Sequence, residues 1–388
     1  MCSRFDMPEQ PHDPILANDF RALWEEVRTD ALAAMDRVGG SGWFVLGREV
    51  EAFERALAEH AGLGFAVGTA NGMDALEIAL RAGGLRHGEK VLTTPLSAFA
   101  STLAILRAGG KPVFVDVDES GLVDLVLARR AFADDPALRW FLPVHLFGHC
   151  LNLDQLQELR DEFGLRIVED CAQSVGATWR DRPCGTVGFA AATSFYPTKN
   201  LGAMGDGGAI LTPDAELAAA ARQWRDYGQS AKYVHRVAGL NSRLDELQAA
   251  ILRDAILPRL DRFTKRRREI AAFFSRELRH DLVHPAPEPT GSQGVFHLYP
   301  VLVEQDRDGL LKNLKRMQVV AGIHYPSLIP SQPAMREVEA ETIGCLEQAT
   351  RFAACELSLP VHPFLTDSQV EYVVEACHSW RPLSSRDA

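Results

Sequence analysis

The sequence predicts an α/β protein built around a largely parallel sheet. Between residues 64 and 228, short β-rich runs alternate with helical segments of about a dozen residues, a pattern typical of parallel strands joined by helices. Some of these runs, such as "LRIVED" at 165–170, are apolar enough to be buried. The length of 388 residues allows a second, smaller domain.

Local patterning gives the order of the elements. Residues 20–38 and 47–62 have helical periodicity and end at glycines, which predicts two amphipathic helices before the sheet. We expect seven strands, at residues 64–70, 89–95, 111–118, 138–148, 165–170, 189–197 and 207–213. Helices are expected at residues 72–84, 99–110, 152–164 and 213–228.

The pattern changes near residue 255. A long helix, a proline-rich stretch, a strand and another helix are expected at residues 257–280, 284–294, 295–303 and 309–318. The sequence therefore predicts a large domain at residues 1–255, which includes the N-terminal helical segment, and a small α+β domain at residues 256–388.

Composition excludes some classes of function. The formal net charge of −11 disfavours nucleic-acid binding, because such proteins present a basic field. The concentrated basic run at residues 265–268 is expected to form the solvated face of a helix. No apolar run has the length needed to span a membrane.

The cysteines and histidines predict neither disulfides nor a metal centre. Seven cysteines are scattered without CxxC spacing, which favours reduced thiols in a cytoplasmic protein. A zinc site built from His145, His149 and Cys150 would lack a second pair of ligands nearby, so no metal is expected.

Lys199 is the residue with the clearest chemical signal. It lies in "SFYPTKNLGAMGDGGAI", where no other charged residue occurs between Ala190 and Gly205. Two polar groups fall nearby at the ends of predicted strands, where open α/β sheets bind ligands: Asp170 after "LRIVE" and Ser194 before Lys199. In "ANGMDAL", a strand turns into a helix at Gly72 and Met73, which forms an anion site of backbone N–H groups.

Together these groups suit pyridoxal phosphate. This cofactor needs a lysine for its Schiff base, a carboxylate for its pyridine nitrogen, donors for its phosphate and a flat group over its ring. Phe99, at the start of a predicted helix, could supply the flat group. A lysine that attacks a carbonyl must be neutral, and surroundings without other charges favour the neutral amine.

The whole chain resembles the sugar-aminotransferase family of fold-type-I pyridoxal-phosphate enzymes (DegT/DnrJ/EryC1/StrS-like). The motifs that carry the resemblance include "ANGMDAL", "VEDCAQSVGA", "SFYPTKNLGAMGDGGAI", "NSRLDELQAA" and "GIHYP". The resemblance implies an aspartate-aminotransferase-like large domain. The segment "KYVHRVAGLNSRLDELQAAIL" is most similar to enzymes that aminate keto deoxysugars linked to nucleotides, with the 3-keto members the nearer match.

The resemblance also implies roles for matching residues. Lys199 would form the Schiff base and move the proton between substrate and cofactor, and Asp170 would pair with the pyridine nitrogen. Gln173 would bond the phenolic oxygen and Phe99 would stack on the ring. The phosphate would be held by Ser194, by the backbone of Gly72 and Met73, and by Asn241 of a neighbouring subunit in a homodimer. His324 and Tyr325 are candidates for contact with the substrate, and His145, His235 and Arg243 are weaker ones.

The implied reaction takes nitrogen from an amino acid, by family expectation L-glutamate, and delivers it to a keto sugar. Two departures concern the substrate and the phosphate: Met73 stands where threonine or serine is common, and "SLIPSQPA" replaces a stretch rich in proline and histidine. Alternatives are an aminotransferase acting on a cyclitol or other cyclic ketone, and a cofactor-binding sensor without turnover. A sugar dehydratase is a further rival, which Lys199 disfavours because such relatives carry histidine there.

Overall fold

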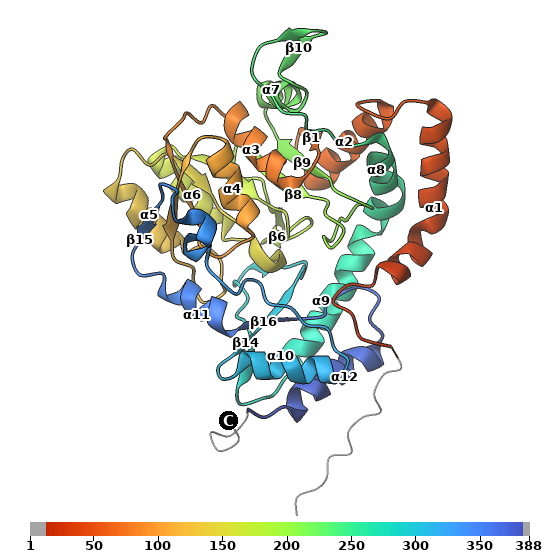
Figure 1. Ribbon diagram of the computed structural model, residues 1–388, viewed down its shortest axis with the longest axis vertical. Coiled ribbons are helices and arrows are strands. Elements are labelled where there is room, and N and C mark those ends of the chain that lie inside the picture. Colours follow the sequence, from red (N-terminus) through yellow and green to blue (C-terminus); the bar gives the residue numbers. More distant parts are fainter. Residues whose placement is uncertain (1–12, 383–388) are drawn as a thin grey trace, which may run out of the picture.

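The computed structural model describes residues 13–382. Its largest feature is an eight-stranded sheet with the order β1-β9-β8-β5-β4-β2-β3-β15 (Figure 1). Neighbouring strands are parallel except around β9, which is antiparallel to both β1 and β8. The strands are β1 Phe65–Thr69, β2 Lys90–Thr93, β3 Lys111–Val115, β4 Trp140–Leu142, β5 Arg166–Asp170, β8 Ala190–Ser194, β9 Gly208–Thr212 and β15 Glu341–Ile343.

Seven of these strands match the predicted ones, but the prediction of seven strands is one too few. The eighth strand, β15, comes from the C-terminal part of the chain and pairs in parallel with β3 at the edge of the sheet. All three of its residues are exposed, so the sequence carries no hydrophobic pattern that could have revealed it.

Helices pack on both faces of the sheet, and alternating residues of the strands contact different layers. Ala66 packs with α1 (Phe20–Ser41), α2 (Arg48–Ala61) and α8 (Glu246–Ile251), whereas Val67 packs with the opposite layer. The layer on the Val67 side contains α3 Gly72–Ala82, which packs against α4 Phe99–Arg107 and α7 Ala215–Arg225, whereas α5 Leu125–Asp134 and α6 Leu153–Phe163 pack against each other. The sequence analysis missed α5, although its buried residues have helical spacing.

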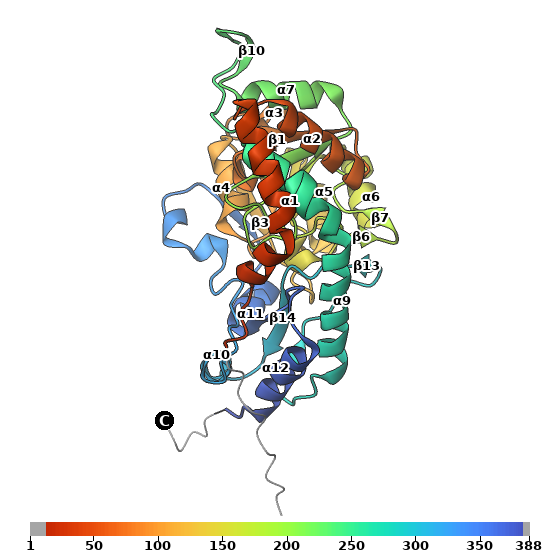
Figure 2. The ribbon, with the colours of Figure 1, turned by 90° about the vertical axis from the view of Figure 1, so that its right-hand side faces the viewer.

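The C-terminal part has its own core. A three-stranded antiparallel sheet, in the order β12-β14-β16, packs against α9, α10 and α12 (Figure 2). These elements are β12 Val283–Pro285, β14 Tyr299–Val303, β16 Glu356–Leu359, α9 Leu260–Glu277, α10 Arg307–Arg316 and α12 Asp367–Ser379, with α11 Glu347–Cys355 leading into β16. The start of the described chain also joins this part, because Ile15 forms a parallel bridge with Val319. The boundary at residue 255 stays a prediction.

Two small sheets complete the fold. The hairpin of β10 (Gln229–Ala231) and β11 (Val234–His235) stands clear of the body in both views (Figures 1 and 2). A second sheet joins β6, β7 and β13, at Thr178–Trp179, Arg182–Pro183 and Ser292–Gln293. None of the helices within residues 13–382 combines the length and the apolar character needed to cross a membrane.

The basic run on α9 is only partly a solvated face: Lys265 is exposed as predicted, but the prediction is wrong for Arg267. Arg267 is buried, and its guanidinium donates hydrogen bonds to the carbonyl oxygens of Phe296 (3.1 Å) and Val361 (2.5 Å). Burial lowers the pKa of Arg267 to about 10. The side chain therefore joins α9 to two loops of the C-terminal part.

Glu246 holds α2 against α8. Its side chain is buried, and its two oxygens accept hydrogen bonds from the backbone N–H groups of Gly47 (2.9 Å), Glu49 (3.0 Å) and Val50 (2.9 Å). These donors lie at the N-terminus of α2, where no intrahelical acceptor exists. Glu246, within the motif "NSRLDELQAA", thus has a structural role.

We expect Glu246→Ala to lower the free energy of unfolding by about 3 kcal/mol, because it leaves three N–H groups at a helix start without their charged acceptor. Glu246→Gln keeps one acceptor oxygen and should cost less. Urea unfolding followed by circular dichroism measures both. Glu51→Ala is the control, since Glu51 is exposed on the same helix. Equal stability of Glu246→Ala and Glu51→Ala would contradict this role.

Candidate active site

The carboxyl ends of β5 and β8 bring the main candidates together. Asp170 ends β5, and its buried carboxylate accepts hydrogen bonds from Ser101 Oγ (2.8 Å) and from the backbone N–H of Ala172 (3.0 Å). Ser101 comes from α4 and bonds in turn to Ser97 (3.0 Å). Sequence reasoning missed Ser101, because a serine in an apolar helix carries no signal of its own.

Lys199 lies in the loop that connects β8 to β9. Burial lowers the pKa of Lys199 to about 8, and the opposing influence is the negative charge of Asp170. Within residues 13–382, the ammonium nitrogen makes no hydrogen bond or ion pair. A substantial fraction of the amine is therefore neutral and nucleophilic near neutral pH.

The start of α3 offers backbone N–H groups that could bind an anion. Asn71 caps this helix by accepting a hydrogen bond from the backbone N–H of Asp74 (2.8 Å), which leaves the N–H groups of Gly72 and Met73 in the first turn. A Cβ at Gly72 would lie 2.7 Å from Ser194 Cβ, so only glycine allows this close approach. The Met73 side chain packs into the core and leaves its backbone as the group that can face an anion.

Gln173 and Tyr325 form the next layer of the site. Gln173 Oε1 accepts from the backbone N–H of Phe147 (2.6 Å), and its Nε2 donates to the Tyr325 hydroxyl at 3.4 Å. Burial raises the pKa of Tyr325 to about 12, so the phenol keeps its proton. This contact brings the segment "GIHYP" of the C-terminal part to the carboxyl end of the large sheet.

His324 lies beside Tyr325, and the two rings meet edge to face with centroids 5.6 Å apart. Burial lowers the pKa of His324 to about 4, and the nearby charge of Lys199 acts in the same direction. The imidazole is therefore neutral at physiological pH. A neutral ring beside the lysine can exchange hydrogen bonds with a substrate without adding charge.

Other predicted residues lie outside this group. Phe99 begins α4 and packs beside Phe114, Ile329 and Met335. Asn241 is exposed and lines a hollow with Ala70, Gly205, Asp206 and Arg243.

Two weaker candidates lie near the projecting hairpin. Arg243 bonds Asp226 (3.0 Å) and stacks on Tyr227, whereas His235 is exposed and bonds the Tyr227 carbonyl (2.8 Å). Within the single chain, none of Asn241, His235 and Arg243 contacts Lys199.

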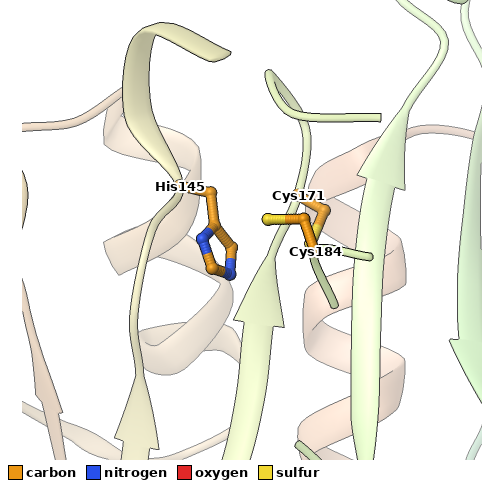
Figure 3. Close-up of side chains that lie close together, drawn as sticks. All are labelled: His145, Cys171 and Cys184. Carbon is orange, nitrogen blue, oxygen red and sulfur yellow. The ribbon is translucent and has the colours of Figure 1, made fainter. Parts of the chain in front are cut away.

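His145 is buried below the site and faces no open space. Its Nδ1 accepts from the backbone N–H of Leu151 (3.0 Å), and its Nε2 bonds Glu169 (2.9 Å). This position argues against a contact with substrate. Figure 3 shows the sulfur atoms of Cys171 and Cys184 beside the ring, a grouping different from the histidine and cysteine set considered in the sequence. Both ring nitrogens already have partners, so a metal would have to displace one of these bonds.

These residues fit pyridoxal phosphate. A buried carboxylate, a lysine of lowered pKa and a glycine-lined helix start lie around one end of the sheet, and a glutamine and a tyrosine close the side. The fold and this arrangement define a pyridoxal-phosphate-dependent aminotransferase of fold type I.

Comparisons with known proteins agree. Residues 25–378 match the model of the DegT/DnrJ/EryC1/StrS aminotransferase family. The chain is 41% identical to a dTDP-3-amino-3,4,6-trideoxy-alpha-D-glucose transaminase of Streptomyces venezuelae, over 96% of this chain and 97% of the relative. It is 38% identical to a "pleiotropic regulatory protein" of Geobacillus stearothermophilus, over 92% and 96%.

Two solved structures are similar over nearly the whole chain. S. venezuelae DesV in complex with a ketimine intermediate superposes with a TM-score of 0.90, at 40% identity, and covers 95% of this chain and 98% of its own. NtdA of Bacillus subtilis with bound cofactor PMP gives a TM-score of 0.86 at 26% identity, covering 96% and 86%. The chain belongs to the DegT/DnrJ/EryC1/StrS aminotransferase family.

We expect Asp170→Asn to lower the pKa of Lys199 below about 8, because it removes the negative charge that stabilises the ammonium form. The rate at which a small amine-reactive reagent modifies Lys199 in the cofactor-free protein, followed by mass spectrometry against pH, gives this pKa. Asp206→Asn is the control, since its charge does not act on Lys199. An unchanged midpoint in Asp170→Asn would contradict the pairing.

Proposed function

We propose that this protein transfers an amino group to a keto sugar carried on a nucleoside diphosphate, with L-glutamate as the donor. The observation that carries the proposal is the burial of Lys199 at the carboxyl end of the sheet, close enough to Asp170 for that charge to act on its pKa. The transaminase of S. venezuelae, which is 41% identical over nearly the full length of both chains, supports the substrate class. By its motifs, the chain is most similar to the family members that act on 3-keto-6-deoxyhexoses.

Different residues of the chain would have different roles in the reaction. Bound pyridoxal phosphate supplies an electron sink for the substrate carbon that loses or gains a proton. Lys199, neutral when its proton is lost, would accept that proton and return it to the cofactor within the same half-reaction, so it acts as both base and acid in each half-reaction. The Asp170 carboxylate, held by Ser101, keeps the pyridine nitrogen protonated. Gln173 orients the phenolic oxygen through its free amide hydrogen.

The remaining roles are binding roles. Ser194 and the backbone N–H groups of Gly72 and Met73 hold the phosphate, which gains from the positive end of α3. Phe99 covers the ring. His324 and Tyr325 face the sugar, since Tyr325 bonds Gln173 and the charge of Lys199 acts on His324.

A cyclitol or other cyclic ketone would need the same cofactor residues, so only a panel of substrates separates that alternative. A cofactor-binding sensor without turnover is the second alternative. The regulatory name of the Geobacillus relative favours it, whereas the lowered pKa of Lys199 favours catalysis. We place the enzyme in the cytoplasm on the basis of its scattered thiols, six of which are unpaired in the described part of the chain.

We expect the purified protein to absorb as a yellow cofactor complex and to lose that absorption when L-glutamate is added. A nucleoside-diphosphate keto sugar should then restore it. Lys199→Ala should remove turnover because the proton-transferring amine is gone, while the fold remains. Lys232→Ala, in the exposed hairpin, is the matched control. Full turnover in Lys199→Ala would exclude the mechanism, and a yellow protein unchanged by any amino acid would favour the sensor.

We also propose that the enzyme is a homodimer whose active sites lie at the interface. A surface suited to a partner lies between α1 and α2, where Trp43 is 62% exposed and Phe44 is 52% exposed. Asn241 lines the same hollow as Ala70, and Ala70 lies between the end of β1 and Gly72. In the dimer, Asn241 of one subunit would bond the phosphate held by the other.

Mixing two defective variants tests this arrangement. Lys199→Ala and Asn241→Ala should each be impaired, but a refolded equal mixture should regain about a quarter of the parental activity, because mixed dimers contain one intact site. If Asn241 served its own subunit, every mixed site would carry a defect and the mixture would gain nothing. Size-exclusion chromatography with light scattering checks the dimer itself.

A further inference from the structure

A chain of hydrogen bonds leads from His324 into the C-terminal core. His324 Nδ1 lies 2.9 Å from Ser358 Oγ, and Ser358 Oγ donates to Glu356 Oε1 at 2.5 Å. The backbone N–H of His324 donates to Glu356 Oε2, also at 2.5 Å. Glu356 and Ser358 lie on β16, and both are buried. The proposed function gives no role to either residue.

The backbone fixes the geometry of this chain. Gly322 pairs with Ser358, with N–H to carbonyl distances of 3.1 and 2.8 Å in the two directions. A Cβ at Gly322 would lie 2.9 Å from His324 Cε1, so the imidazole lies directly against the glycine. The ring therefore has one orientation, with Nδ1 toward Ser358.

The hydroxyl of Ser358 has a single proton, so it can donate to only one of its two partners, Glu356 or His324, at a time. When the Glu356 carboxylate is ionised it can only accept, so Ser358 donates to it and must accept from Nδ1–H of His324. The imidazole Nε2 then carries a lone pair. When Glu356 is protonated it can donate to Ser358, Ser358 donates to Nδ1, and Nε2 carries the proton.

We propose that Glu356, acting through Ser358, determines which ring nitrogen of His324 carries the proton, and therefore whether Nε2 offers a substrate oxygen a donor or an acceptor. Within the described residues, Nε2 has no hydrogen-bond partner in the protein. Glu356 and Ser358 are thus positioning residues for the His324 contact. The inference rests on the proposed function only in taking the oxygen to belong to the sugar substrate.

The charged groups around these hydrogen bonds are compatible with a change of the protonated ring nitrogen. The pKa of His324, about 4, keeps the ring neutral, so one nitrogen carries the proton and the other does not. Burial raises the pKa of Glu356 to about 8, against the lowering effects of Ser358, the His324 N–H and Arg307. His297 and Lys199 also face this region, since the charge of Lys199 lowers the pKa of both histidines. Below pH 8 the donor form of Nε2 should dominate, and above pH 8 the acceptor form.

The test is to observe the tautomer directly in the holoenzyme. In full-length protein labelled with ¹⁵N-histidine, and with His324→Gln for assignment, we expect His324 to carry its proton on Nε2 at pH 6.5 and on Nδ1 at pH 9.5. Glu356→Gln should hold the Nε2–H form at both pH values, because its amide donates to Ser358 as the protonated acid does. Ser358→Ala should lose the pH response, and Ser358→Thr should restore it.

Activity provides a second readout. The pH dependence of kcat/KM for the keto sugar should have, besides the titration of Lys199, a component near pH 8 that Glu356→Gln lacks, while the reaction with L-glutamate keeps its profile. A parental tautomer that does not change with pH, or a Ser358→Ala response equal to the parent, would overturn the inference. The nuclear magnetic resonance measurement needs no turnover, so it tests the inference even if the proposed function fails. Failure of the proposed function would instead appear as cofactor absorption that no amino acid changes. Variants are compared only where cofactor absorption and circular dichroism match the parent.

Discussion

The placement of a carboxylate at the buried end of β5 is the constraint on which the rest of the site depends. A charge there is costly unless hydrogen bonds and a cation compensate for lost water. Ser101 and the Ala172 N–H donate the hydrogen bonds, and the negative charge of Asp170 acts on Lys199. Burial acts on Lys199 in the opposite sense, and the balance sets a pKa of about 8. A lysine poised in this way can be either acid or base, which transamination requires.

Much of the fold could be predicted from the sequence because strands and helices alternate with clear periodicity. Asp170 and Ser194 could be proposed because polar residues at the ends of apolar strands are exceptional, and Lys199 because no other charged residue lies near it in the sequence. Ser101 could not be found, since only the packing of α4 brings it to β5. Strand β15 and the burial of Arg267 were likewise hidden, because both depend on contacts distant in sequence.

The site is assembled from both parts of the chain. The large sheet supplies the groups for the cofactor, and the segment after Gly322 supplies His324 and Tyr325. His324 is held by the antiparallel sheet through its hydrogen bonds to Ser358 and Glu356 on β16. His324, which we propose to meet the substrate, is therefore oriented by a core separate from the one that orients Asp170 and Lys199. Substrate preference can change in such a scaffold while the cofactor site stays intact.

Strand β15 has a consequence for the order in which the protein is made. Its partner, β3, ends at residue 115, so more than 200 residues are synthesised before residues 341–343 cover that edge. During this interval β3 presents unpaired N–H and carbonyl groups of an apolar strand, which is a template for association with other chains. The late strand thus completes the sheet and removes this site of association only after most of the chain has been synthesised.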